Sequence, residues 1–348
     1  MTGNTLGWVI VAFVLYLLMM IAIGAFYAKG NNNSEDYFLG GRKLNGFVAA
    51  LSAQASDMSG WLLMGLPGAI YLTGVGGDGW IAIGLFIGTT LNWLFIATKL
   101  RRYTIRANNS VTLPTYFENR FHDEKKVLMT VSSITIVVFF LVYCASALSA
   151  GGQLFESVFG IDYHVALTIG ALVVLVYTFL GGFTAVCVTD FIQGMLMLVG
   201  ILAVPLFAYH FMTSGGTTLS AGLEASGADS TNFLNLMKNG DGSNNIVSVI
   251  SGLGWGLGYF GMPHILVRFM AVRDEKEMTK SKATAISWVA LSLGFAVFIG
   301  ILGRAYLPEL VNGNNEKVFI EMIKKVFTVE MRAPFIAGLF LCGILAAI

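Results

Sequence analysis

The chain has 348 residues, of which 56% are hydrophobic and only 12% are charged. A soluble protein carries about 25% charged residues, and the mean hydropathy of this chain is +0.74. The composition therefore excludes an ordinary soluble protein and predicts an all-α integral membrane protein with the lipid bilayer as its surroundings, because a membrane β-barrel would show short alternating segments. The formal net charge is +1, and no basic patch with interleaved aromatics indicates a nucleic-acid partner.

Nine apolar segments follow one another along the chain, and most have the ~20 residues that a helix needs to cross a bilayer. They are residues 6–27, 46–72, 79–98, 127–155, 164–180, 187–212, 246–271, 283–303 and 333–348. The first is too long for a signal peptide and lacks a basic start, so we expect it to remain as a span. The second and fourth are longer than a span requires, and we expect each to tilt, project or be interrupted.

The lysines and arginines predict the orientation of these spans. If the N-terminus lies on one side of the membrane (side one) and successive loops lie on alternate sides, side two carries 15 of the 21 basic residues, among them Lys29 and Arg268. Cytoplasmic loops carry an excess of basic residues, so we expect the N-terminus outside. The polar segment 213–245 is then an external loop, and the amphipathic pattern at 316–327 predicts a helix lying on the outer surface.

The three cysteines, Cys144, Cys187 and Cys342, all lie in apolar segments and form no CxxC pair. This placement predicts buried small side chains and neither a disulfide nor a metal site.

Two carboxylates lie inside apolar segments. Asp57 is in the middle of the second segment, in LSAQASDMSGWLLMGLP (51–67), and Asp190 is near the start of the sixth, in FTAVCVTDFIQG. An ionisable group at bilayer depth is costly and therefore indicates a functional site. For each residue the alternative is a neutral, hydrogen-bonded aspartic acid or one that lies near the interface.

The residues around Asp57 predict a broken helix. Ser56, Ser59 and Gly60 weaken the helix here, and Pro67 follows. An unwound segment frees backbone carbonyls, which together with hydroxyl and carboxylate oxygens suit a hard cation such as Na⁺. The alternative is that these small residues serve close helix packing.

The seventh segment predicts a second break. It reads SGLGWGLGYFGMPHILVRFMA (251–271), with five glycines before Pro263. If the helix persists locally, Trp255 and Tyr259 share one face and present aromatic rings to a solute. The alternative is close packing around two core aromatics.

The two interrupted segments are five spans apart and therefore cross the membrane in opposite directions. This arrangement is typical of an inverted-repeat transporter. We expect a single transmembrane domain with an extra N-terminal helix at 6–27, a first five-helix repeat at 46–212 and an incomplete second repeat at 246–348. The ninth segment stops at Ile348 partway through a span, so we also expect the chain to continue in the full protein.

Several stretches resemble the sodium/solute symporter family, and within it the branch that transports proline. They are EDYFLGGRKL (35–44), ALSAQASDMSGWLLMGLPGAIYLTG (50–74), VTLPTYFENRF (111–121), YCASALSAGGQLFES (143–157), YTFLGGFTAV (177–186) and GWGLGYFGMPHILVRFMA (254–271). The resemblance implies a five-plus-five helix core in the bacterial inner membrane. Sodium would bind between the second and ninth segments.

The resemblance also implies which residues form the sodium site. Main-chain oxygens of Ala55 and Met58 and the carbonyl of Ala347 would be ligands, whereas Asp57 and Ser59 would act directly or by holding the broken helix. Asp190 matches an acidic position linked to sodium. The family's hydroxyl pair that completes the site would follow Ile348.

For the solute, the resemblance assigns Tyr143, Trp255, Tyr259 and Pro263, with Trp61 nearby. Aromatic faces suit a pyrrolidine ring and its ammonium group. Met262 occupies a position where the proline branch is expected to carry glutamine.

Two further residues near the second break each allow two interpretations. We expect His264 to be a hydrogen-bonded structural group; a proton relay is the alternative. We expect Arg268 to be an interfacial anchor or part of an inner gate.

Together these observations predict a secondary active transporter that takes up L-proline with Na⁺ as coupling ion by alternating access, without an organic cofactor. Two alternatives stay open: another small organic solute, or a transporter-like sensory domain of a larger signalling protein. No nucleotide loop, nucleophile triad or metal motif predicts an enzyme.

Overall fold

The computed structural model describes residues 3–28 and 33–347. Within these ranges the chain forms helices and turns with two isolated β-bridges and no strand, which confirms the all-α prediction. Five helices are long and apolar enough to cross a membrane, and one bent helix pair counts as a sixth. Lys29 and Ile348, on which the orientation and the last segment partly depended, lie outside the described residues.

The helices follow the predicted segments closely. The membrane helices and their continuations are α1 (Gly3–Ala28), α3 (Gly46–Gly60) with η2 (Trp61–Gly65) and α4 (Leu66–Thr73), α5 (Val75–Leu91) with η3 (Asn92–Ile96) and α6 (Ala97–Arg106), α8 (Val127–Phe159), α9 (Tyr163–Ser214), α12 (Ile246–Gly254) with η4 (Trp255–Gly261) and α13 (Pro263–Ala271), α14 (Glu275–Tyr306) and α16 (Pro334–Ala346). The shorter elements are α2 (Ser34–Leu39), η1 (Gly40–Arg42), α7 (Leu113–Phe121), α10 (Leu219–Ala225), α11 (Ser230–Phe233), η5 (Pro308–Asn312), η6 (Asn315–Lys317), α15 (Val318–Ile323) and η7 (Lys324–Glu330).

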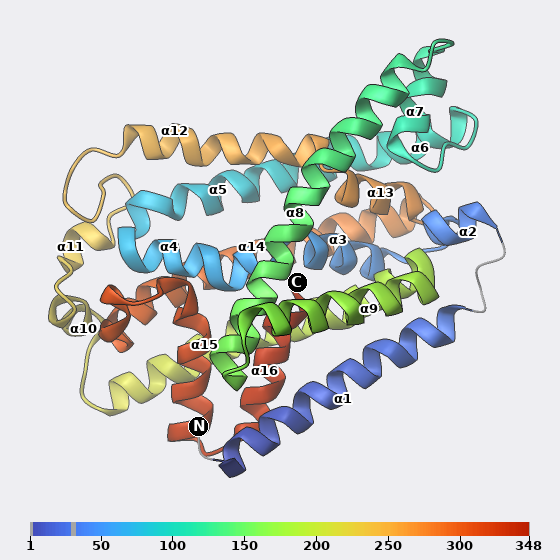
Figure 1. Cartoon of the computed structure of the whole chain (residues 1–348). Helices are drawn as coiled ribbons and strands as arrows, with labels where there is room; N and C mark the ends of the chain where they lie inside the picture. The colour runs from blue at the N-terminus through green and yellow to red at the C-terminus, as the bar shows by residue number, and fades with distance from the viewer. Residues whose placement is uncertain (1–2, 29–32, 348) are drawn as a thin grey trace.

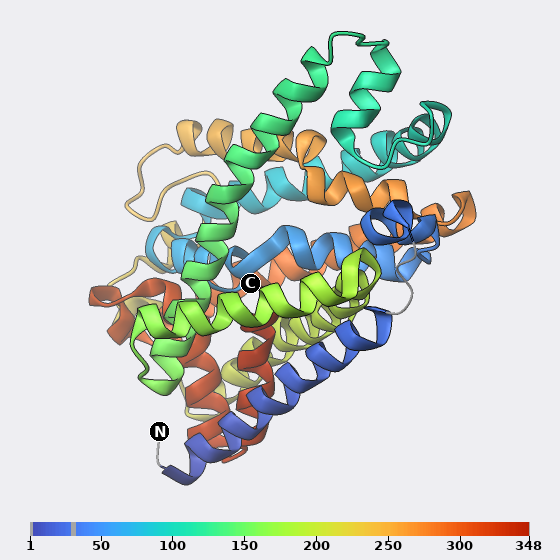
Figure 2. The same cartoon turned by 45° about the vertical axis from the view of Figure 1, so that its right-hand side comes forward.

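The predicted fifth and sixth segments lie together in α9. The backbone of Gly182 has φ 61° and ψ −165°, outside the helical region. Glycine tolerates this conformation without a Cβ clash. In both views the chain turns back here, so that the two parts of α9 run side by side (Figures 1 and 2). The turn lies in the gap between the predicted segments 164–180 and 187–212.

Helix α3 lies among α9, α13 and α14, while α8 crosses the bundle and projects beyond it toward α7 (Figures 1 and 2). The most apolar part of α8 contains no buried residue. Its outward side chains include Ile134, Val138 and Leu141, all exposed. Apolar exposure on this scale is typical of a helix that contacts lipid or further helices. Cys144 is exposed on the same helix, which corrects the prediction that all three cysteines are buried.

Residues 316–327 do not lie on the outer surface, contrary to the prediction. They fall in η6, α15 and η7, where Phe319, Ile323 and Phe327 are at most 1% exposed. Helix α15 contacts α4, α14 and α16. The amphipathic pattern therefore reflects packing against the protein, because a membrane surface and a protein interior select the same apolar stripe.

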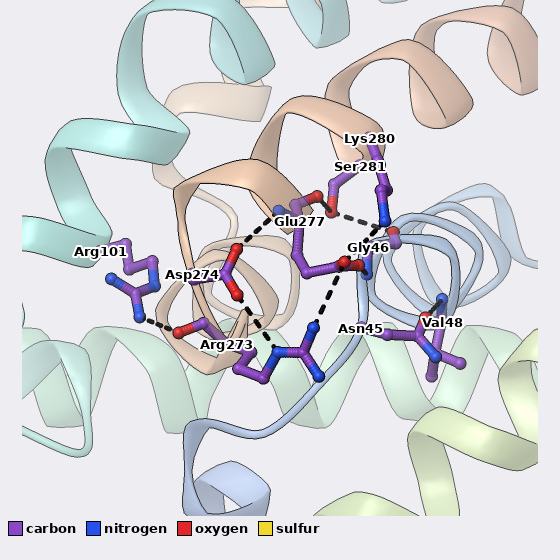
Figure 3. Close-up of polar contacts among 9 residues, drawn as sticks. All are labelled: Asn45, Gly46, Val48, Arg101, Arg273, Asp274, Glu277, Lys280 and Ser281. Carbon is purple, nitrogen blue, oxygen red and sulfur yellow. Dashed lines mark hydrogen bonds and ion pairs between the residues drawn. The ribbon is translucent and has the colours of Figure 1, made fainter.

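The first residue of α3 is fixed to the first turn of α14 (Figure 3). The Gly46 N–H donates to the Glu277 carboxylate at 2.6 Å, and the Ser281 hydroxyl donates to the Gly46 carbonyl at 2.9 Å. Asp274 caps α14 by accepting from the Glu277 N–H at 2.9 Å, which lowers the pKa of Asp274. Arg101 donates to the Arg273 carbonyl, so α6 also joins this end of the bundle.

Glycines bring α5 and the α12–η4 segment into backbone contact. A Cβ on Gly84 would lie 2.2 Å from the Gly252 carbonyl oxygen, and a Cβ on Gly256 would lie 2.2 Å from the Gly84 carbonyl oxygen. Small residues allow this approach in membrane helices. The glycine-rich seventh segment is therefore a packing surface as well as a break.

We expect Gly84→Ala to destabilise the protein by about 1–3 kcal/mol, because the added methyl group meets backbone that cannot rotate away. The measurement is the melting temperature of the purified protein in detergent. Gly294→Ala on α14 is the matched control, since its Cβ would meet nothing within 4 Å. Equal melting temperatures for both variants would contradict the close-packing interpretation.

Candidate functional site

Helix α3 is broken at Ser59, as the sequence predicted. Ser59 has φ 46° and ψ −171°, a region that residues other than glycine almost never adopt. The chain then resumes as the π-helical turn η2 and the helix α4. A break of this kind within a membrane is tolerated only where it lines a cavity or is buried in protein.

Tyr143 reaches the break from α8. Its hydroxyl donates to the Ser56 carbonyl at 2.8 Å and lies 3.4 Å from the Asp57 carbonyl. The Ser59 hydroxyl accepts from the Trp61 N–H at 3.3 Å. The broken helix is therefore held in part by a residue that was predicted to contact the solute.

An inner cavity of about 280 Å³ lies against the C-terminal half of α3. Four of the predicted sodium residues line it: Ala55, Ser59, Asp190 and Ala347. Ala55 and Ser59 are four residues apart, so they share one face of α3. Ala347 directly follows α16, and the cavity thus joins the two helices between which the sodium site was predicted.

Asp57 and Met58 do not line this cavity. Asp57 is two residues from Ala55, which turns its side chain about 200° around the helix. It is only 9% exposed, and the Tyr259 hydroxyl lies beside its carboxyl group. Met58 is 2% exposed with its side chain in the apolar core, which leaves only its main-chain oxygen as a candidate ligand.

An outer cavity of about 310 Å³ begins on the other side of the break. Ser59, Trp61 and Tyr143 line it together with Gln153 of α8 and Glu316 of η6. The Trp61 ring stacks on Trp255, with ring centroids 5.9 Å apart and an interplanar angle of 21°. Three of the five predicted solute residues therefore gather here.

The seventh segment is interrupted, as predicted. Residues 255–261 form the 3-10 helix η4, and α12–η4 meets α13 at an angle of 46°. Trp255 is 50% exposed, whereas Tyr259 is 3% exposed. They do not share a face, because three residues per turn place residues i and i+4 about 120° apart. Pro263 is in the first turn of α13 and lines neither cavity.

Arg268 and Asp190 form a buried ion pair at 2.8 Å between α13 and α9. Asp190 also accepts from the hydroxyls of Ser52 and Ser56, at 2.6 and 3.1 Å. The Arg268 guanidinium donates to the same two hydroxyls at 2.7 and 2.6 Å. Arg268 is therefore not an interfacial anchor. The sequence analysis did not identify Ser52 and Ser56 as joint partners of this ion pair. Their spacing of four residues, which places both hydroxyls on one helix face, is a signal for that role.

His264 is not a hydrogen-bonded structural group. Both ring nitrogens are buried and have no hydrogen-bond partner among the described residues. The ring instead stacks on Tyr143, with centroids 5.5 Å apart, and contacts Phe140 edge to face. Aromatic contacts therefore hold the imidazole beside the inner cavity.

Residues 37–348 match the model of the Sodium:solute symporter family. The chain belongs to this family. Its members are transporters, not enzymes, and a multi-span membrane protein fits the apolar helices described above. Among the described residues no group of three or more His, Cys, Asp and Glu side chains could hold a metal ion.

Several curated members of the sodium:solute symporter family are similar to this chain. A sodium/proline symporter of Salmonella typhimurium is 45% identical over 345 residues, which are 97% of this chain and 66% of that protein. The Escherichia coli sodium/proline symporter is 44% identical with the same coverage, and that of Staphylococcus aureus is 42% identical over 341 residues, or 64% of its length. The chain spans about two thirds of the length of the relatives it matches.

A solved structure shows the same fold. It is a Na⁺-coupled sialic acid symporter in a substrate-bound outward-open state, with a TM-score of 0.78 and 21% sequence identity. The match covers 98% of this chain and 70% of that chain. The arrangement of helices predicted for this chain is therefore that of a known sodium-coupled symporter.

The buried ion pair gives a stability prediction. Asp190→Leu or Arg268→Met alone should destabilise the protein by about 3–5 kcal/mol, because each leaves one buried charge without its partner. The double variant should lose much less than the sum of the two. Melting temperatures of the four proteins in detergent measure this coupling, and additive losses would show that the two charges do not depend on each other.

Proposed function

We propose that the protein containing this chain is a sodium-coupled symporter that takes up L-proline by alternating access. The observation that carries this proposal is the break in α3 at Ser59, which lies between two cavities and next to the end of α16. The similarity to sodium/proline symporters supports proline as the solute.

Sodium would bind on the inner-cavity face of α3. We propose the main-chain oxygens of Ala55, Met58 and Ala347 as ligands, with Ser59 holding the break. Oxygen ligands suit a hard cation, and the cavity brings Ala55, Ser59 and Ala347 together. Asp190 would act on this site through its ion pair with Arg268, which crosses from α9 to α13.

Proline would bind around the outer cavity. Trp61, Trp255 and Tyr143 are the residues we propose to contact it, because stacked rings suit both a pyrrolidine ring and an ammonium group. Tyr259 and Pro263 would act indirectly, since Tyr259 is buried against Asp57 and Pro263 begins α13. Sodium that stabilises the break would order this cavity, and by reciprocity proline would tighten sodium binding by the same factor.

The topology is part of the proposal. We place the protein in the bacterial inner membrane with its N-terminus outside, since α2, α6 and α7 gather at one end of the bundle, away from α10 and α11 (Figure 1). The end with α2, α6 and α7 carries Arg42, Arg101, Arg102 and Arg106, which suits a cytoplasmic face. Residues 46–212 would form the first five-helix repeat, and residues 246–348 would belong to the second.

Proline uptake into proteoliposomes that hold the full-length protein tests the proposal. An inward Na⁺ gradient should drive accumulation of labelled proline, whereas an equal K⁺ gradient should not. Competition by unlabelled solutes checks the substrate. Folded protein that accumulates no proline under the Na⁺ gradient would refute the assignment.

The stacked pair predicts a solute-specific effect. Trp255→Ala should raise the proline concentration needed for half-maximal uptake roughly 2- to 30-fold, because a ring face that attracts the ammonium group is lost. Trp255→Phe should retain most of the affinity. The sodium dependence at saturating proline should stay unchanged, and a shift in sodium dependence alone would contradict a contact with the solute.

A further inference from the structure

An open groove of about 740 Å³ lies between α3, the second half of α9 and α14, and it shares no lining residue with the inner or the outer cavity. Each helix contributes one stripe of side chains at helical spacing. The stripes include Phe47 and Leu51 of α3, Met195 and Leu198 of α9, and Thr284 and Leu291 of α14. Phe47, Met195 and Leu291 are 53%, 44% and 46% exposed, and such exposed apolar side chains suit a hydrocarbon partner.

The floor of the groove also offers apolar contact. Trp288 lines the groove and is only 3% exposed. Its indole N–H donates to the Gly194 carbonyl at 3.2 Å, so the polar edge of the ring already has a partner. What remains for the groove is the apolar ring, and a ligand here gains by leaving water or polar surroundings behind.

The groove has the length of one leaflet of a bilayer. Lys280, Thr284, Ser287 and Leu291 follow one another along one face of α14, each three or four residues from the next. At ~1.5 Å per residue, the step from Lys280 to Leu291 spans about 16 Å. The hydrocarbon core of a bilayer is ~30 Å thick, so one leaflet contributes about 15 Å. An acyl chain of one leaflet therefore fits along this face.

A basic side chain stands at one end of the groove (Figure 3). Lys280 is half-exposed, and its Nζ donates to the Glu277 carboxylate at 2.8 Å. An ammonium group has three N–H donors, so two remain for a further acceptor. Lys280 comes just before the apolar segment 283–303, which places it at the depth of the lipid headgroups.

The same end of the groove is closed by the junction between α3 and α14. A Cβ on Gly46 would lie 2.4 Å from the Glu277 carbonyl oxygen, so the two backbones are in contact. Asn45 lines the groove and caps α3 by accepting from the Val48 N–H at 2.9 Å. A molecule in the groove therefore lies against the junction that fixes the start of α3.

We propose that this groove binds an anionic phospholipid, with one acyl chain along α3, α9 and α14 and the phosphate at Lys280. Mostly apolar walls of leaflet length and a cation at one end match the two parts of such a lipid. The bound lipid contacts α3 and α14 together and stabilises their junction, so a movement of α3 away from α14 has to expel the chain. The proposal holds whichever solute the protein transports.

Native mass spectrometry of the purified full-length protein tests the proposal, with phosphatidylglycerol and phosphatidylcholine of the same acyl chains as the two lipids. Ser287→Phe places a ring in the groove. Its control is Ala290→Phe, because Ala290 is exposed on α14 and does not line the groove. Lys280→Gln removes the charge at the headgroup end. Its control is Lys282→Gln, because Lys282 points about 200° away from Lys280 and donates to the Leu94 carbonyl at 3.4 Å.

We expect the wild-type protein to retain phosphatidylglycerol more strongly than phosphatidylcholine, and Ser287→Phe to lose this binding. Lys280→Gln should weaken phosphatidylglycerol binding about five-fold, the contribution of one basic residue near a membrane surface. Both controls should bind like the wild type. Phosphatidylglycerol should also raise the melting temperature of the wild type and leave that of Ser287→Phe unchanged, because the lipid stabilises the junction of α3 and α14.

Melting temperatures without added lipid show whether each variant is folded. Folded wild-type protein that retains both lipids equally would refute an anionic lipid at Lys280. Folded Ser287→Phe protein that retains phosphatidylglycerol like the wild type would place the lipid outside the groove and overturn the proposal. Should Ser287→Phe be unfolded, Thr284→Phe gives the same test on the same stripe of α14.

Discussion

The backbone at Ser59 is the constraint on which the rest of the site depends. A helix broken at bilayer depth exposes carbonyl oxygens that no water in the hydrocarbon core can satisfy, so they need partners from the protein or from a bound ion. Tyr143 supplies one such partner from α8, by donating to the Ser56 carbonyl at 2.8 Å. The strained Ser59 conformation can persist only because neighbouring helices converge on it. Two cavities meet at this residue, and alternating access by way of the break would expose each in turn.

Charge balance explains why the two membrane carboxylates differ. Asp190 has a complete set of partners in Arg268, Ser52 and Ser56, and such a buried pair is neutral and rigid. Asp57 has Tyr259 beside it and forms no ion pair with any of the described residues. Each is an aspartate in an apolar segment, and the neighbours in the sequence set Asp57 apart but name a partner for neither residue. Only the three-dimensional arrangement separates a carboxylate that is ion-paired between helices from one whose neighbour is the Tyr259 hydroxyl.

The sequence predicted the helical fold and both breaks, because they depend on local signals: apolar length, glycine and proline placement, and serines around a mid-span carboxylate. It did not predict features that depend on partners distant in the chain. Arg268 was predicted to be an interfacial anchor or part of an inner gate, and its ion pair was not predicted because its partner Asp190 is 78 residues away. The faces of Trp255 and Tyr259 depended on whether residues 255–261 were α-helical or 3-10.

The glycines of the seventh segment link the packing of the bundle to the surroundings of Asp57. A Cβ on Gly88 would lie 2.2 Å from the Gly256 carbonyl oxygen, so α5 and η4 are in backbone contact immediately before Thr89. This contact brings the Thr89 side chain to the Tyr259 hydroxyl, three residues beyond Gly256. Larger residues would move α5 outward and separate Thr89 from Tyr259 and Asp57. The glycines therefore serve close approach of two backbones as much as flexibility, and the Tyr259 hydroxyl lies between Asp57 and Thr89 because the glycines let α5 and η4 meet.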